Sequence, residues 1–202
     1  MFNVSHRWHT VGVSRAACFR FLRKAVLGKS VAIVGNARSL RDANNGALID
    51  RHDIVVRLNS APGAALASHG AKTTWLATSQ NVSSARLRQL NPTLILWMTP
   101  KTRWRIWHLR FRGWSVIAYP VSHWRSSSRL VQGARPSTGF MIVEFLHSLG
   151  GYAELKLFGF DFFKSGSLSK RKNDSRIPHD FQKEQEVVMR LFSRDERHTI
   201  VT

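Results

Sequence analysis

Acidic residues and cysteine are scarce in this sequence of 202 residues. Asp and Glu number 12 against 31 Lys and Arg, so the formal net charge is +19 at pH 7. Such a surface attracts anions, and nucleic acid, anionic lipid head groups and phosphorylated glycans are all candidates. Cys18 is the only cysteine, so no disulfide can form within the chain, and a reducing, cytoplasmic setting is expected.

Long apolar runs are also missing. No stretch approaches the roughly 20 apolar residues of a membrane span, and the start, MFNVSHRWHT, lacks the features of a signal peptide. With 43% hydrophobic residues the chain is expected to be globular. We divide it into a basic amphipathic N-terminal segment, residues 1–29, and one α/β domain, residues 30–202.

The N-terminal segment contains Phe19, Leu22 and Val26 at helical spacing, with arginine and lysine beside them. This pattern is typical of a helix that lies on a membrane surface. It is equally typical of an ordinary amphipathic helix that packs on the domain.

Glycine-rich loops and metal-ligand spacings are absent. The segment VAIVGNARSL (31–40) reads as strand, turn and helix, as in nucleotide-binding domains, but its single glycine matches neither the dinucleotide fingerprint nor the P-loop. No Asp-x-Asp, His-x-x-x-His or Cys pair is present, so no metal site is expected.

Short apolar runs alternate with polar or helix-like segments along the chain. The runs are SVAIVG, DIVVRLN, TTWLATS, TLILWMT, WSVIAYP and ELKLFGF, and HTIV near the C-terminus could add an edge strand. The alternation predicts a mostly parallel sheet flanked by helices, an α/β fold.

Polar residues end the first three of these strands. Gly35 and Asn36 end the first, Asn59 ends the second, and Ser79-Gln80-Asn81 end the third. Ligands of open α/β sheets bind outside the carboxyl ends of the strands. These neutral amides and hydroxyls therefore suit a ribose, a base edge or a sugar.

Arg57 is a charged residue within a strand that is expected to be buried. Alternation places it on the face of Val55 and Asn59. An unpaired buried charge is costly, so Arg57 either pairs with Asp50 or Asp53 or contacts a ligand.

Ser137, Thr138 and Gly139 precede a strongly apolar segment, where they could cap a helix and bind a phosphate at its N-terminus. Plain N-capping is the alternative. Asp161 follows the strand ELKLFGF at once, and it could orient a substrate hydroxyl or cap a turn.

His179 stands at the start of another helix, in PHDFQKEQEVVMRLF (178–192). The positive end of the helix dipole disfavours imidazolium, so His179 should stay neutral and could act as a general base. Structural capping is the alternative. Glu184 in the first turn complements the dipole.

Two basic stretches stand apart from these motifs. KTRWRIWHLRFRGW (101–114) mixes arginine with tryptophan, and SKRKNDSR (169–176) has the composition of a loop. Basic residues among aromatics can bind nucleic acid or lie at a lipid interface. They can also form a solvated face whose aromatic residues are buried.

The motifs resemble, in order, those of the sialyltransferases of glycosyltransferase family 29, in a bacterial-type form. Residues 31–63 resemble the large sialylmotif, and GAKTTWLATSQ (70–80) continues the likeness. Residues 135–163, with Ser-Thr-Gly, resemble the small motif, and HDFQKE (179–184) resembles the very small motif.

This resemblance implies a single Rossmann-like domain that transfers a sugar from a CMP-sugar donor without a metal or other cofactor. Asn36 and Asn59 would contact the nucleotide, with Gly35 forming the turn between strand and helix. Ser137, Thr138 and Gly139 would cradle CMP. His179 would be the catalytic base of an inverting displacement on a glycan or glycolipid hydroxyl.

Several features depart from the family. The cysteines of its animal members have no counterpart in the matching motifs, and the N-terminal anchor of those members is not expected here. The family's aromatic–histidine motif is not recognisable, and Lys164, His123 or residues 170–172 could replace it. The donor sugar could be sialic acid or Kdo, and the acceptor a cell-surface polysaccharide or lipopolysaccharide precursor. The basic surface could hold the enzyme at an anionic inner membrane; a nucleic-acid-binding protein and an inactive CMP-binding protein are the alternatives.

Overall fold

The computed structural model describes residues 15–61, 66–162 and 179–201. Seven strands form one sheet in the order β5-β4-β3-β2-β1-β6-β7, and every neighbouring pair is parallel. Their bounds are β1 Ser30–Val34, β2 Ile54–Leu58, β3 Trp75–Thr78, β4 Leu94–Trp97, β5 Val116–Ala118, β6 Glu154–Phe158 and β7 His198–Val201. Each predicted run contains one strand, and HTIV is an edge strand, so the α/β prediction is confirmed.

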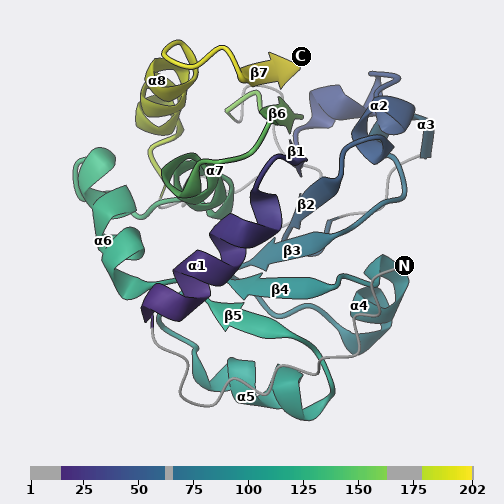
Figure 1. Ribbon diagram of the computed structural model, residues 1–202, viewed down its shortest axis with the longest axis vertical. Helices are drawn as coiled ribbons and strands as arrows, with labels where there is room; N and C mark the ends of the chain where they lie inside the picture. The colour runs from purple at the N-terminus through teal and green to yellow at the C-terminus, as the bar shows by residue number, and fades with distance from the viewer. Residues whose placement is uncertain (1–14, 62–65, 163–178, 202) are drawn as a thin grey trace.

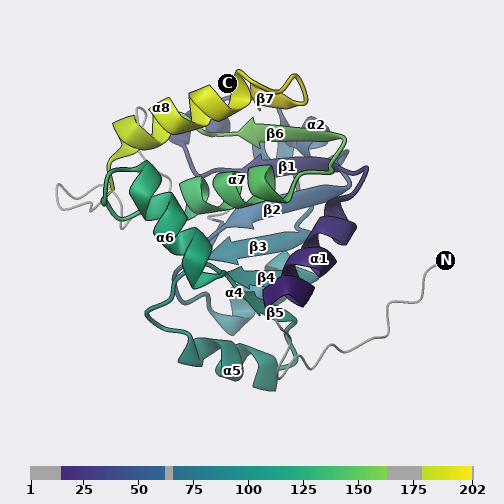
Figure 2. The same cartoon turned by 60° about the vertical axis from the view of Figure 1, so that its left-hand side comes forward.

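Helices cover both faces of the sheet (Figures 1 and 2). One face carries α1 Arg15–Val26, α6 Val121–Leu130, α7 Thr138–Leu149 and α8 Phe181–Phe192. The other carries the 3₁₀ helix η1 Arg38–Arg41, α2 Gly46–Asp50, α3 Leu66–His69, α4 Ser84–Leu90 and α5 Trp104–Phe111. In the part of the chain that the structure describes, no helix is both long enough and apolar enough to cross a membrane.

Strand residues alternate between the two layers of core. In β1, Val31 and Ile33 face α7, whereas Ala32 and Val34 face η1 and α2. Because both faces are covered by helices, a strand of this sheet must be apolar on both sides. This explains why the strands appear in the sequence as short continuous apolar runs.

Helix α1 packs on the domain. Leu22 and Val26 are buried in the main core, and Phe19 packs against it from the edge. Of the two interpretations of this segment, the structure shows the packed amphipathic helix for residues 15–26. Residues 1–14 lie outside the described residues.

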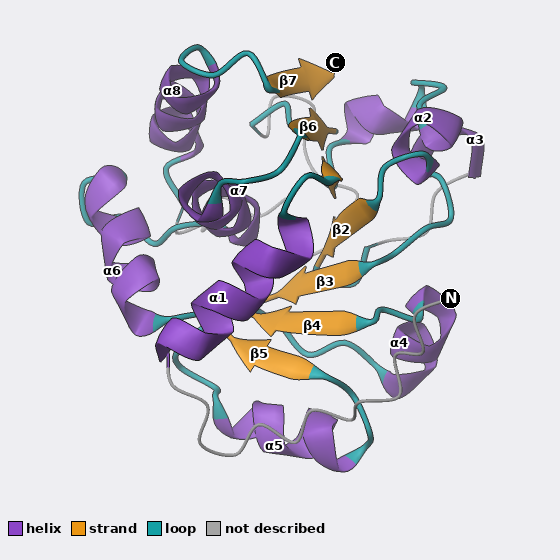
Figure 3. Cartoon of the chain, in the orientation of Figure 1, coloured by secondary structure: helices purple, strands orange, loops and turns teal. Residues whose placement is uncertain are grey.

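The strand order reverses next to β1. From β1 the chain proceeds through β2, β3 and β4 to β5, and then crosses back to place β6 on the other side of β1 (Figure 3). Loops that leave neighbouring strands in opposite directions open a crevice at the carboxyl ends of those strands. The fold therefore provides a ligand-binding position beside the ends of β1 and β6.

Candidate functional site

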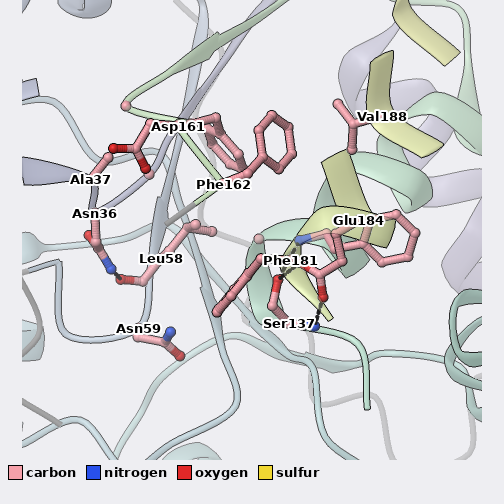
Figure 4. A pocket seen from close by; sticks show the side chains of 15 residues that line it. Asn36, Ala37, Leu58, Asn59, Ser137, Asp161, Phe162, Phe181, Glu184 and Val188 are labelled. Atoms are coloured by element: carbon pink, nitrogen blue, oxygen red, sulfur yellow. Dashed lines mark hydrogen bonds between the residues drawn. The ribbon is translucent and has the colours of Figure 1, made fainter. Parts of the chain in front are cut away.

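A pocket occupies this position at the carboxyl ends of β1, β2 and β6 (Figure 4). Asn36 and Asn59 lie on one side of it, and Ser137, Phe181 and Glu184 lie opposite. Its lining also includes residues from the β1, β2, β6, α7 and α8 segments, namely Gly35, Ala37, Leu58, Gly139, Phe140, Gly159, Phe160, Asp161, Phe162 and Val188. Five of the seven residues predicted to bind the donor or catalyse transfer therefore line one pocket.

Gly35 is required by a close approach of two loops. Its amide donates to the Phe158 carbonyl oxygen at 2.7 Å, and a Cβ at position 35 would collide with the Gly159 carbonyl oxygen. The loops after β1 and β6 therefore touch at residue 35. Glycine is needed here to let the two backbones meet, which explains a turn with one glycine.

The two predicted asparagines present complementary groups. Asn36 Nδ2 donates to the Leu58 carbonyl oxygen at 3.3 Å. Asn59 has a φ of +56°, a left-handed conformation that asparagine tolerates, and its Oδ1 accepts from the Ser79 amide at 3.1 Å. Within the described ranges, Asn36 Oδ1 and Asn59 Nδ2 have no hydrogen-bond partner, which leaves one acceptor and one donor for a ligand.

Glu184 connects α8 to the start of α7. Its carboxylate accepts from the Ser137 amide and from Ser137 Oγ, both at 2.6 Å, and its side chain is buried. Ser137 Oγ in turn caps α7 by accepting from the Phe140 amide at 3.1 Å. The sequence offered one signal for this contact, because Glu184 shares a helix face with the buried Val187 and Val188.

These contacts occupy some of the backbone amide donors at the N-terminus of α7. The Ser137 and Phe140 amides are bonded within the protein, whereas the amides of Thr138 and Gly139 have no acceptor in the part of the chain that is described. Thr138 does not line the pocket, and its hydroxyl donates to Ser79 Oγ at 2.8 Å. Two backbone donors thus remain for an anion at this helix end.

His179 lies directly before Asp180, the N-cap of α8, and it is not among the residues that line the pocket. Its Nδ1 lies 2.7 Å from the Arg135 carbonyl oxygen. A carbonyl oxygen only accepts, so Nδ1 carries a hydrogen, and in a neutral ring with this tautomer the lone pair is on Nε2. Arg135 is two residues before Ser137, so two contacts connect the start of α8 to the start of α7.

The charged side chains that line the pocket are carboxylates. They are Asp161, whose Oδ2 accepts from Ser39 Oγ at 3.5 Å, and Glu184; no Lys or Arg lies among these lining residues. Lys164, residues 170–172 and the basic stretch 169–176 lie outside the described residues. His123 is on α6, stacked on Phe19 at 6.0 Å between ring centroids, and it is not among the pocket lining.

Phe160, Phe162 and Phe181 form an aromatic part of the pocket lining that sequence reasoning missed. Across residues 15–61, 66–162 and 179–201, no group of three or more His, Cys, Asp or Glu side chains could hold a metal ion.

Arg57 is buried, but it forms neither of the expected ion pairs. Its guanidinium donates to the carbonyl oxygens of His69, Gly70 and Lys72 at 2.8 to 3.0 Å, and to Thr73 Oγ1 at 3.1 Å. Burial lowers the pKa of Arg57, and the nearby charge of Asp50 opposes this shift.

Asp50 and Asp53 have other partners. Asp50 accepts from the amides of Ala71 and Lys72, and Asp53 accepts from Ser30. The expected ion pair was wrong because the loop before β3 supplies enough carbonyl oxygens to satisfy the guanidinium. Arg57 therefore supports the loop between α3 and β3.

Comparisons with known proteins give one match in sequence and several in fold. Residues 27–107 match the family model described as glycosyltransferase family 29 (sialyltransferase). This range contains the segments 31–63 and 70–80, whereas the segments at 135–163 and 179–184 lie beyond it. No curated protein matches the chain significantly in sequence.

Several solved sialyltransferases share the fold. A mammalian sialyltransferase in complex with Gal-beta-1-3GalNAc-ortho-nitrophenol superposes with a TM-score of 0.62 at 20% identity, over 96% of this chain and 82% of that chain. CstII from Campylobacter jejuni in complex with CMP-3FNeuAc gives a TM-score of 0.52 at 15% identity, over 85% and 78%. CstII in complex with cytidine-5'-monophosphate gives a TM-score of 0.55 at 15% identity, over 86% of this chain and 79% of that chain. Residues 27–107 therefore resemble glycosyltransferase family 29 (sialyltransferase) in sequence, and the fold over most of the chain is shared with solved sialyltransferases.

Proposed function

We propose that the protein is a CMP-sugar-dependent glycosyltransferase that moves sialic acid, or Kdo, to a hydroxyl of a glycan. One observation carries this proposal: three segments far apart in the sequence, around Asn36, Ser137 and His179, meet at the carboxyl ends of β1, β2 and β6. Complexes of CstII with CMP and with CMP-3FNeuAc support a donor of this class.

The pocket offers suitable groups for a nucleoside monophosphate. Asn36 Oδ1 and Asn59 Nδ2 can bond a ribose or a base edge, and the aromatic lining can pack against a ring. The amides of Thr138 and Gly139 can bond the single phosphate. A cation for that phosphate would come from Lys164 or residues 170–172, as proposed from the sequence.

His179 would act as the general base of an inverting displacement. The acceptor hydroxyl oxygen forms a bond to the anomeric carbon, its proton goes to His179 Nε2, and the bond from the anomeric carbon to the phosphate oxygen breaks so that CMP leaves with the electron pair. The Arg135 carbonyl oxygen fixes the tautomer that this step needs. A positioned base contributes on the order of 10²–10⁴-fold.

The test is CMP release and sugar transfer from CMP-sialic acid and from CMP-Kdo, with galactose-terminated disaccharides and lipopolysaccharide core as acceptors. His179→Ala should keep CMP binding and lose on the order of 10²–10⁴-fold in turnover, whereas the exposed His108→Ala should behave as wild type. Turnover by His179→Ala at the wild-type rate would remove His179 as the base.

An inactive CMP-binding protein is the second candidate. The observation that favours it is that the described residues that line the pocket include no histidine, lysine or arginine to act as a base or to stabilise the leaving phosphate. This alternative would be supported if the protein bound CMP but released no CMP from CMP-sialic acid or CMP-Kdo with any acceptor tried. The acceptor class, a cell-surface polysaccharide or lipopolysaccharide precursor, and a cytoplasmic location at the inner membrane belong to the same proposal.

A further inference from the structure

Helix α5 carries apolar side chains on two opposite faces. Ile106 and Leu109 are buried in the core beneath the sheet. Trp104, Trp107 and Phe111 point away from it and are 62%, 60% and 95% exposed. Residues three and four apart share one helix face, so these three form a solvent-facing aromatic stripe. Burial in the domain accounts for the first face and leaves the aromatic stripe without a role in folding.

Cations flank the aromatic stripe. Lys101 and Arg103 are exposed just before the helix. The Arg105 guanidinium lies 4.7 Å from the centroid of the Trp104 ring, and that of Arg110 lies 6.0 Å from the Trp107 ring. Arginine on tryptophan keeps the charge at the boundary between an apolar and an aqueous phase.

Carboxylates are absent from this part of the molecule. No Asp or Glu occurs in the sequence between Asp53 and Glu144. The region that carries α5, from β3 to β5 with α4 and α6, therefore has positive charge with no negative charge of its own. The net charge of +19 is thus unevenly distributed along the chain, and the segment that includes the aromatic stripe contributes only positive charge.

We infer that the aromatic stripe docks the protein on the surface of an anionic lipid bilayer. Tryptophan and phenylalanine enter the boundary between head groups and acyl chains, while arginine and lysine bind the anionic head groups. Helix α5 lies beyond β5 at the edge of the fold (Figure 1), and the exposure of the three aromatic side chains leaves them accessible to a planar surface. Single-stranded nucleic acid also stacks on aromatic rings, but it is usually held in a groove.

Vesicle co-sedimentation tests this inference on the full chain. The vesicles are phosphatidylcholine alone and phosphatidylcholine mixed with phosphatidylglycerol. The test variant replaces the aromatic stripe (Trp104→Gln, Trp107→Gln, Phe111→Gln), and its matched control replaces three exposed apolar residues elsewhere in the chain (Leu27→Gln, Leu66→Gln, Met189→Gln). A charge variant, Lys101→Gln with Arg103→Gln, is matched by Arg190→Gln with Arg194→Gln on and after α8.

The wild type should bind the mixed vesicles and not pure phosphatidylcholine. The stripe variant and the charge variant should each lose about tenfold or more in vesicle affinity. Both matched controls should bind as wild type, and every variant should keep the CMP affinity of the wild type, which separates this surface from the pocket.

Three results would overturn the inference. They are failure of the wild type to bind the mixed vesicles, wild-type binding by the stripe variant, and an equal loss in the matched controls. Binding of single-stranded RNA that is lost in the stripe variant while vesicle binding is unchanged would assign the stripe to nucleic acid instead.

Discussion

At the scale of single residues, the start of α7 depends on Glu184. Both of its carboxylate oxygens accept hydrogen bonds from Ser137, and the side chain is only 3% exposed. Ser137 is also the N-cap of α7 and a lining residue of the pocket. Loss of the carboxylate would therefore disturb folding and the pocket together.

We predict that Glu184→Ala lowers the free energy of unfolding by about 2–3 kcal/mol, because the buried Ser137 amide and hydroxyl lose their acceptor. Urea denaturation measures this. Glu186→Ala is the matched control on the same helix. Its partner is Lys183 at 2.7 Å on the surface, and such pairs contribute less than about 1 kcal/mol. Equal losses in the two variants would contradict the account.

Arg57 is a second buried charged residue, and its guanidinium donates hydrogen bonds to four acceptors. We predict that Arg57→Lys lowers the free energy of unfolding by about 2–3 kcal/mol, because an ammonium cannot reach the four acceptors that the planar guanidinium reaches. The exposed Arg88→Lys on α4 should change it little. If Arg57→Lys instead left stability unchanged and weakened CMP binding, Arg57 would contact the ligand.

At the scale of elements, α1 is held by its buried face. Leu22 is 1% exposed, and Leu27, just after the helix, is 62% exposed. We predict that Leu22→Ala costs about 2–4 kcal/mol of unfolding free energy from lost burial and the cavity that remains. Leu27→Ala should cost less than about 1 kcal/mol, and thermal and urea denaturation of the two variants measure the difference. If both variants lost less than about 1 kcal/mol of unfolding free energy, the stability of α1 would not depend on the burial of Leu22 in the core.

The contact between α6 and α7 contains a buried carboxylate, Glu144, which accepts from Tyr119 Oη at 3.3 Å and from Ser127 Oγ at 3.2 Å. Burial raises the pKa of Glu144 above its ordinary value of 4.5, although both donors oppose the shift. The folded state therefore holds this proton more tightly than the unfolded state. Its contribution to stability is full below pH 4.5 and is lost as the pH rises through the raised pKa.

We predict that Glu144→Gln, which keeps an acceptor but cannot ionise, becomes more stable relative to wild type as the pH rises from about 4 to about 8. Urea denaturation across this range measures the change. Glu186→Gln on the exposed face of α8 is the control. A stability difference between Glu144→Gln and wild type that stays constant with pH would show that the pKa of Glu144 is the same in the folded and unfolded states.

Elements were the part of the fold that the sequence predicted well. Apolar runs such as SVAIVG are local patterns, and their short length, their β-branched residues and the turn residues beside them indicate buried strands. Contacts between elements were harder. Glu184 and Ser137 are far apart in the sequence, and dipole complementation accounted for Glu184 without any partner. Arg57 donates to backbone carbonyl oxygens rather than to a carboxylate. Every residue has a backbone carbonyl, so the sequence does not indicate which ones a buried guanidinium will contact.

At the scale of the whole molecule, the pocket and the aromatic stripe belong to different parts of the fold. The pocket is formed at the carboxyl ends of β1, β2 and β6, whereas α5 packs beside β5, the strand at one edge of the sheet. The net charge indicated an anionic partner without saying where it would bind. The fold separates the pocket from the aromatic stripe, so donor binding and surface attachment can be tested independently.

The most direct test of the central proposal is a calorimetric titration of the protein with CMP. We predict binding at one site. Asn59→Asp should weaken it by about tenfold or more, because the substitution keeps the acceptor for the Ser79 amide but replaces the Nδ2 donor with a negative charge. Asn44→Asp, at an exposed position outside the pocket, should bind CMP as wild type does. A folded protein that gives no binding heat with CMP, or an Asn59→Asp variant with wild-type affinity, would contradict the assignment of this pocket.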